Sequence, residues 1–214
     1  SKPRNEFTEQ ALARLCQVHL KAKNYDSAIP VLKRLETEAD FPQNTTYAQS
    51  NLMKSYYEKQ DFTNAVVYAD KVLKNDKIDD RIKSDAQIIV ARSAIKTNDE
   101  AKAKEAYAKL QKIAKGELAA EALYYDAYFK NKEGKFEPSN VVVQKIAQDY
   151  SGYKYYGAKS LVIMAKNFYG LKDSFQATYI LESVIENFKE YTDVIEEAQK
   201  ELDFIKGEEA KRNS

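Results

Sequence analysis

The segment KNYDSA, residues 23–28, recurs four more times along the chain in altered form, and this repetition decides the fold. Each copy follows an apolar stretch and combines a short polar turn, usually an aromatic residue, and a small residue near the start of a second apolar stretch. The later copies are QDFTNA (60–65), NDEAKA (98–103), GKFEPS (134–139) and KDSFQAT (172–178). With Ala28, Ala65, Ala103, Ser139 and Thr178 taken as equivalent, successive copies are 37, 38, 36 and 39 residues apart. A period near 37 that is kept four times indicates a chain of structural repeats.

We interpret each repeat as two amphipathic helices joined by a tight turn. Only six glycines and four prolines occur in 214 residues, which favours helices over strands. Neither helix buries its apolar face alone, so the units must stack. The sequence therefore predicts an all-α fold, a right-handed α–α superhelix of about five helix pairs with a C-terminal capping helix. The predicted boundaries are a disordered head at 1–6, a single repeat domain at 7–206 with repeats at about 8–40, 45–78, 83–116, 119–150 and 157–189 and a cap at 191–206, and a frayed tail at 207–214.

The residues around each turn have predictable roles. The small residue lets the two helices approach closely, and the preceding aromatic ring fills the gap between them. At the start of the second helices, acidic and hydroxyl side chains are predicted to accept hydrogen bonds from free N–H groups. These predicted caps are Asp26, Asp61, Asp99 and Asp173–Ser174. Segments such as 40–44 and 149–157 are predicted to be longer linkers between units.

The repeated pattern resembles the tetratricopeptide repeat family over residues 7–190. It consists of a leucine with a small neighbour, a tyrosine four residues later, an Asn/Gly-Asp turn, an aromatic residue and an alanine. The resemblance implies a solenoid that acts as a non-catalytic protein–protein interaction scaffold, binding a protein or peptide in the groove lined by the first helices. The repeat periods are longer than the family's ~34 residues. In this the chain resembles a cell-envelope subgroup that includes the outer-membrane assembly lipoprotein and the periplasmic partner of the Tol–Pal system. Its C-terminal segment resembles Bacteroidetes proteins. This implies a periplasmic or envelope-associated module of a larger protein or complex, with a cytoplasmic location as the alternative.

Composition excludes several other functions. Lys plus Arg exceed Asp plus Glu by one, which argues against nucleic-acid binding. No apolar run is long enough to span a membrane. One cysteine and one histidine exclude a Cys/His zinc cage, and no glycine-rich phosphate loop occurs. Cys16 and His19 share a helix face at packing positions, so we expect no metal, no cofactor and no catalytic residues.

Tyrosines provide the main candidate for a binding surface. Eight of the 16 lie between Tyr124 and Tyr169, and tyrosine is enriched in protein interfaces. The candidate partner-binding residues are Tyr124, Tyr125, Tyr128, Tyr153, Tyr155 and Tyr156. Packing of tyrosines in the linkers is the competing interpretation, and a ligand-sensing domain with a tyrosine-rich pocket is the alternative function. The oligomeric state stays open.

Some members of the family clamp a C-terminal carboxylate with lysine and asparagine on the first helices. The matching positions of the first three repeats hold Ala13 and Gln17, Ser50 and Lys54, and Ile88 and Arg92. The clamp is therefore missing from these repeats, although Lys54 and Arg92 still offer positive charge to an acidic group and complete the candidate set.

Overall fold

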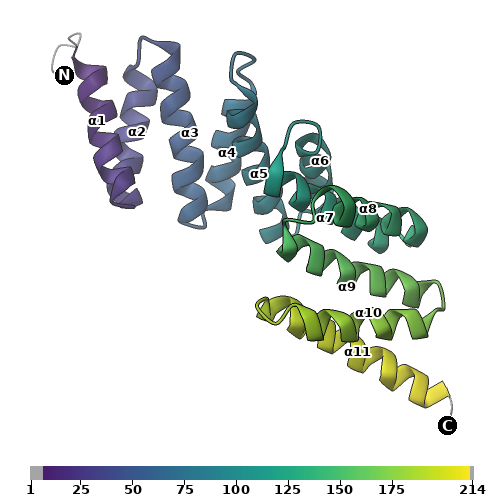
Figure 1. Ribbon diagram of the computed structural model, residues 1–214. Helices are drawn as coiled ribbons and strands as arrows, with labels where there is room; N and C mark the ends of the chain where they lie inside the picture. The colour runs from purple at the N-terminus through teal and green to yellow at the C-terminus, as the bar shows by residue number, and fades with distance from the viewer. Residues whose placement is uncertain (1–6, 213–214) are drawn as a thin grey trace. The chain divides into compact units, whose positions relative to one another are not determined.

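The structure, a computed structural model, describes residues 7–212, and these are all-helical, without a strand (Figure 1). The chain divides into two compact units, the first ending at Ile113 and the second beginning at Ala114, whereas the sequence predicts one domain over 7–206. The first unit contains α1 (Thr8–Lys21), α2 (Tyr25–Glu38), α3 (Pro42–Glu58), α4 (Phe62–Leu73), α5 (Asp80–Lys96) and α6 (Glu100–Leu110). The second contains α7 (Gly116–Lys132), α8 (Phe136–Asp149), α9 (Lys154–Gly170), α10 (Ser174–Asn187) and α11 (Thr192–Arg212).

Within each unit the helices form two layers. We call the first helix of each pair the A helix and the second the B helix. Successive A helices contact one another, α1 with α3 and α3 with α5 in the first unit, and α7 with α9 and α9 with α11 in the second. Among the described residues, successive B helices make no contact of comparable extent. The A helices therefore line the inner face of each unit, and α11 takes the place of a further A helix.

All five A–B turns have the same backbone form. The residue before the N-cap of each B helix has a φ between 52° and 72°, which is the left-handed region. These residues are Lys23, Gln60, Asn98, Gly134 and Lys172. In the first turn the Asn24 amide donates to the His19 carbonyl at 2.9 Å, and the Lys23 amide donates to the Leu20 carbonyl at 3.0 Å. The other turns repeat this pair of bonds, which defines the Schellman motif.

The turn geometry corrects two of our predictions. Asn24, not Asp26, caps α2 by accepting from the Ser27 amide at 3.1 Å, whereas Asp61, Asp99 and Asp173 cap their helices as expected. In the fifth repeat the small residue is Ala177, not Thr178. Its amide donates to the Asp173 carbonyl, as Ala28 does to Asn24, and both alanines are fully buried. The error arose because the fifth copy was aligned with the others on its aromatic residue. Phe175 is 79% exposed and fills no gap between helices, so it is not equivalent to the aromatic residues of the other copies.

The long repeat period has a different origin from the predicted linkers. The helices α3, α5, α7 and α9 each have 17 residues and begin three residues before the predicted repeat starts. Much of segments 40–44 and 149–157 is therefore the first turn of an A helix. Pro42 is the first residue of α3, where its missing N–H costs least, and Asp79 caps α5 by accepting from the Ile82 amide.

The C-terminal helix is longer than predicted. α11 continues to Arg212, past Gly207 where the sequence predicts a frayed tail. Ion pairs from Lys211 to Glu208 and from Arg212 to Glu209 support its last turn. The Ser174 hydroxyl of α10 also donates to Glu209 at 2.8 Å, which holds this turn against the neighbouring helix. The predicted head, residues 1–6, lies outside the described residues.

Candidate functional site

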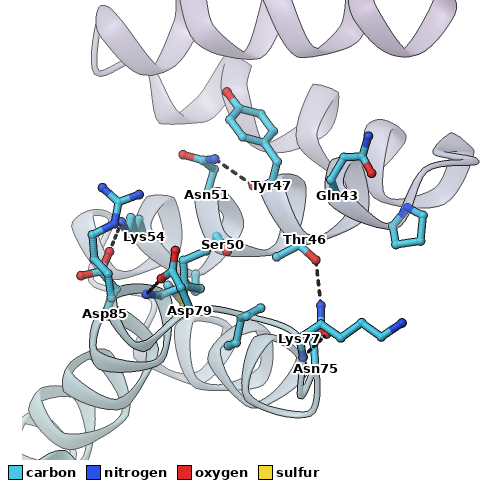
Figure 2. Close-up of a pocket in the computed structure, with 15 residues that line it drawn as sticks. Gln43, Thr46, Tyr47, Ser50, Asn51, Lys54, Asn75, Lys77, Asp79 and Asp85 are labelled. Carbon is cyan, nitrogen blue, oxygen red and sulfur yellow. Dashed lines mark hydrogen bonds and ion pairs between the residues drawn. The ribbon is translucent and has the colours of Figure 1, made fainter. Parts of the chain in front are cut away.

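A cleft opens on the inner face of the first unit, between the A helices α3 and α5 (Figure 2). Its volume is about 630 Å³, which lies within the usual range for ligand pockets. Half-buried Ile82 and nearly buried Ile78 contribute apolar surface, and Tyr47 adds a half-buried ring. The cleft therefore combines an apolar floor with side chains that bear amides and charges along its rim. We call it the α3–α5 cleft.

The connection between α4 and α5 forms one wall of the cleft and is fixed by hydrogen bonds. Asn75 Nδ2 donates to Thr46 Oγ1 at 3.0 Å, and the Lys77 amide donates to Asn75 Oδ1 at 3.0 Å. On α3, Asn51 Nδ2 donates to the Tyr47 carbonyl at 2.8 Å (Figure 2). The wall and the α3 side of the cleft are thus preorganised for a ligand.

Some charged side chains on the rim of the cleft form an ion pair, and others do not. Lys54 Nζ of α3 lies 2.5 Å from Asp85 Oδ2 of α5, so the Lys54 charge is already partnered. Asp79 is engaged as the N-cap of α5. The exposed side chains of Lys77 and Arg81 make no ion pair within the described part of the chain. The rim therefore carries an unpaired positive charge that favours an acidic ligand group.

The second unit holds the tyrosine cluster. Tyr124 of α7 is 5% exposed and belongs to the core, where its ring lies near those of Tyr125, Tyr128 and Tyr156 at centroid distances of 5.0, 6.5 and 6.1 Å. Burial strongly raises the pKa of the Tyr124 hydroxyl. Tyr124 is thus a packing residue, and its place in a partner-binding patch is wrong. Tyr124 is buried on one face of α7 and Phe129 on the neighbouring face, so α7 has buried aromatic rings on two faces.

Tyr155 and Tyr156 are hydrogen-bonded to acidic side chains of neighbouring helices. Tyr155 donates to Asp193 Oδ2 at 2.7 Å, and Tyr156 donates to Oε2 of the buried Glu121 at 2.7 Å. Burial, reinforced by the bond to Asp193, raises the pKa of Tyr155. Lys159 Nζ lies between two of the rings, 4.9 Å from the centroid of Tyr124 and 5.5 Å from that of Tyr155. These contacts make Tyr155 and Tyr156 structural residues that link α9 to α11 and to α7.

Tyr125 and Tyr128 are half-buried, and Tyr153 is exposed with its ring close to Tyr150. Arg92 is half-buried on α5 and is already engaged in an interaction. Lys54 and Arg92 lie in the first unit and the tyrosines in the second.

The only cysteine has the properties of a core residue. Cys16 is fully buried, and burial raises the pKa of its thiol to about 11. A neutral, inaccessible thiol is a poor nucleophile. Across residues 7–212, no cluster of three or more histidine, cysteine or acidic side chains is positioned to hold a metal ion. The helices described include none with the length and apolar character needed to cross a bilayer.

Helix pairs with a shared turn, a small residue at each crossing and an inner layer of A helices define a helical-repeat solenoid. The family model of the tetratricopeptide repeat matches residues 1–117, more than half of the chain, and the chain belongs to this family. Domains of this family generally bind protein partners and are typically non-catalytic. The search of curated proteins finds no match.

One solved structure supports this fold. The chain is similar to a tetratricopeptide repeat protein from Parabacteroides merdae, with a TM-score of 0.74 and 16% identity over 95% of this chain and 75% of that one. A second similar structure is the tetratricopeptide repeat domain of P58(IPK), with a TM-score of 0.42 and 16% identity over 90% of this chain and 65% of that one. At this identity the likeness to the Parabacteroides protein concerns the fold alone.

Proposed function

We propose that the protein is a non-catalytic scaffold that binds a peptide segment of a partner protein in the α3–α5 cleft. The observation that carries this proposal is the composition of the cleft, which has an apolar floor and a rim with hydrogen-bonding groups and unpaired positive charge. Such a site takes an apolar side chain on its floor and an acidic group at the rim near Lys77 and Arg81. The buried, neutral Cys16 supports a role without covalent catalysis.

A display library of random peptides tests this proposal. Peptides enriched on the protein are measured by fluorescence anisotropy against the parent chain and the variants Arg81→Glu and Asn51→Ala. We expect acidic peptides to be enriched and each variant to weaken binding about tenfold, which corresponds to about 1.4 kcal/mol. Val67→Asp, at an exposed position of α4 outside the cleft lining, is the matched control. Enrichment without any acidic preference, or equal binding by Arg81→Glu, contradicts the assignment.

We propose Tyr125 and Tyr128 as a second contact surface for the partner, since tyrosine rings that retain exposure are common interface residues. The ligand-sensing alternative receives no support, because the tyrosine rings pack on one another and the α3–α5 cleft is lined by none of them. Replacing both residues with phenylalanine keeps the packing, and replacing both with serine removes the rings. A loss of partner binding in the serine variant alone supports this second surface.

We further propose a periplasmic or envelope-associated location, as the resemblance to envelope proteins with long repeat periods implies. The support is the repeat period near 37. Fractionation of the native cells, followed by detection with an antibody to this chain, tests the location. Recovery in the cytoplasmic fraction would favour the alternative instead.

A further inference from the structure

The α3–α5 cleft continues into a second hollow along the same two helices. This hollow has a volume of about 150 Å³, and nearly buried Ile88 and Ile89 contribute apolar surface to it. We call it the Ile88–Ile89 hollow. It shares two lining residues with the cleft, Lys54 of α3 and Asp85 of α5. The other cleft residues on these helices precede the shared two, and the other residues of the hollow follow them, so the two cavities lie end to end.

The ion pair between Lys54 and Asp85 stands at the junction of the two cavities. Lys54 Nζ lies 2.5 Å from Asp85 Oδ2, and the two side chains are 49% and 34% exposed, so the pair bridges α3 and α5 near the surface. Figure 2 shows this contact between the helices. A ligand that fills only the cleft leaves the bridge intact. A longer ligand that also enters the Ile88–Ile89 hollow must pass it.

Both members of the bridge have an alternative partner on their own helix. Glu58 follows Lys54 by four residues on α3. Arg81 precedes Asp85 by four residues on α5. Glu58 and Arg81 are exposed and make no ion pair in the described part of the chain. Side chains four residues apart on a helix are neighbours, and exposed ion pairs contribute little to stability, so the bridge exchanges for two pairs along the helices at little cost in free energy.

We propose that the Lys54–Asp85 ion pair is a latch, which an extended partner segment of about seven residues opens to place an apolar side chain in the Ile88–Ile89 hollow. This occupant rests on the proposed function of the α3–α5 cleft, which holds the acidic end of the same segment. Pro42 and Glu58, at opposite ends of the combined lining, are 16 residues apart on α3, which is about 24 Å along a helix. An extended chain rises about 3.3 Å per residue, so the cleft alone takes about five residues and both cavities about seven.

The opened latch leaves each charge with a partner. Lys54 turns to Glu58, and Asp85 turns to Arg81. The guanidinium of Arg81 has five N–H donors, enough for Asp85 and for the acidic group of the segment at the rim. The segment therefore carries an acidic residue at one end and an apolar residue at the other, and its second anchor is the contact with the isoleucines.

A library of random heptapeptides, selected on the parent chain, supplies the probe. The enriched acidic heptapeptide is compared by fluorescence anisotropy with the five-residue fragment that keeps its acidic end. We expect the heptapeptide to bind about tenfold more tightly, because it alone reaches the Ile88–Ile89 hollow and buries a further apolar side chain there.

Two double variants that keep the net charge test the latch. The reversed pair, Lys54→Asp with Asp85→Lys, keeps the bridge but places like charges four residues apart on each helix, so the latch stays closed. We expect it to weaken the heptapeptide about fivefold and not to weaken the pentapeptide. The uncharged pair, Lys54→Gln with Asp85→Asn, removes the latch and is expected to tighten the heptapeptide about threefold and leave the pentapeptide unchanged. Asp26→Asn, which breaks the ion pair with Lys59 outside the groove, is the matched control.

Several outcomes overturn the latch. These are equal affinity for the two peptides, full binding of the heptapeptide by the folded reversed pair, or an equal change in both peptides. If Arg81→Glu weakens both peptides while the two double variants change neither, the proposed function stands and the latch alone is wrong. If no acidic heptapeptide is enriched, or Arg81→Glu changes neither peptide, the proposed function and the latch both fail. Thermal unfolding checks the fold of each variant, and the uncharged pair decides alone if the reversed pair does not fold.

Discussion

The ring of Phe136, the first residue of α8, occupies the space where Gly170, the last residue of α9, would carry a side chain. A Cβ built on Gly170 lies 2.4 Å from Phe136 Cζ and within 2.8 Å of two further ring atoms. The B helix of the fourth repeat thus packs its aromatic residue onto the end of the next A helix, and glycine is required there for close contact.

Gly170→Ala is expected to destabilise the protein by about 1–3 kcal/mol, because the ring of Phe136 must move out of a packed position. Urea denaturation measures the change. Gly157→Ala is the matched control in the same helix, since a Cβ there has no atom within 4 Å, and it is expected to stabilise by roughly 0.5–1 kcal/mol. Adding Phe136→Leu to Gly170→Ala restores part of the loss. Equal stabilities of the two glycine variants would contradict the contact.

Lys23→Gly is expected to increase stability by about 1 kcal/mol, because Lys23 has a φ of 52° and glycine adopts this conformation without steric cost. Ala22→Gly, one residue earlier, has a φ of −80° and is expected to lower stability, since glycine there adds chain entropy to the unfolded state. Equilibrium unfolding distinguishes the two. A loss of stability in Lys23→Gly argues for a role of the lysine side chain in the turn.

Ser55→Ala and Ser93→Ala are each expected to stabilise the protein by about 1 kcal/mol. Both hydroxyls are buried without a hydrogen-bond partner, so removing them relieves a desolvation cost. Ser139→Ala is the control, because its equally buried hydroxyl donates to the Ala127 carbonyl at 2.8 Å. That variant is expected to show no gain. A similar response of all three serines in thermal unfolding means that the two hydroxyls are satisfied in solution.

Alkaline solution is expected to destabilise the protein through its buried tyrosines. Burial raises the pKa values of Tyr124 and Tyr155 in the folded state, so the folded protein holds these protons more tightly than the unfolded chain. Unfolded tyrosines lose theirs near pH ~10. Their contribution to stability is therefore constant below that pH and is lost as pH rises towards the folded pKa values. Tyrosinate absorbance checks this, and Tyr155→Phe reduces the pH dependence. If all tyrosines ionise while the protein stays folded, this prediction is wrong.

Cys16 is expected to resist thiol reagents in the native protein at neutral pH, since its thiol is fully buried and its pKa is raised to about 11. Modification follows only after denaturation. Val18→Cys on the Cys16→Ser background places a thiol on the exposed face of the same helix and reacts at once. Rapid labelling of native Cys16 would reopen the possibility of nucleophilic chemistry in the first repeat.

The repeats were predictable because their strongest constraint is local. A small residue four positions after each cap must fit the helix crossing, and its period survives where the aromatic residue changes. The aromatic residue gave the wrong alignment of the fifth repeat. Phe175 is the second residue of its B helix, whereas Phe62 and Phe136 are the first residues of theirs. The extra residues of the long period were assigned to linkers, since nothing in sequence alone separates a linker from the first turn of a longer A helix.

The binding surfaces were harder to predict. The α3–α5 cleft arises where two A helices and the α4–α5 connection meet, so its residues share no local motif. The segment from Asn75 to Asp79 provides the sole sequence signal, as a polar stretch with one isoleucine. The density of tyrosines did mark a real cluster, but helix spacing cannot distinguish a ring buried between A helices, such as Tyr124, from one on their surface.

The five left-handed turns have a consequence for the local dynamics of the chain. Their amides bond back into the last turn of each A helix, so residues such as Lys23 and Asn24 carry protected N–H groups in spite of their exposed side chains. Hydrogen exchange at these positions requires the preceding helix end to open. The exchange rates of each turn therefore report how often the C-terminal end of its A helix opens, which gives a separate local measurement for every repeat.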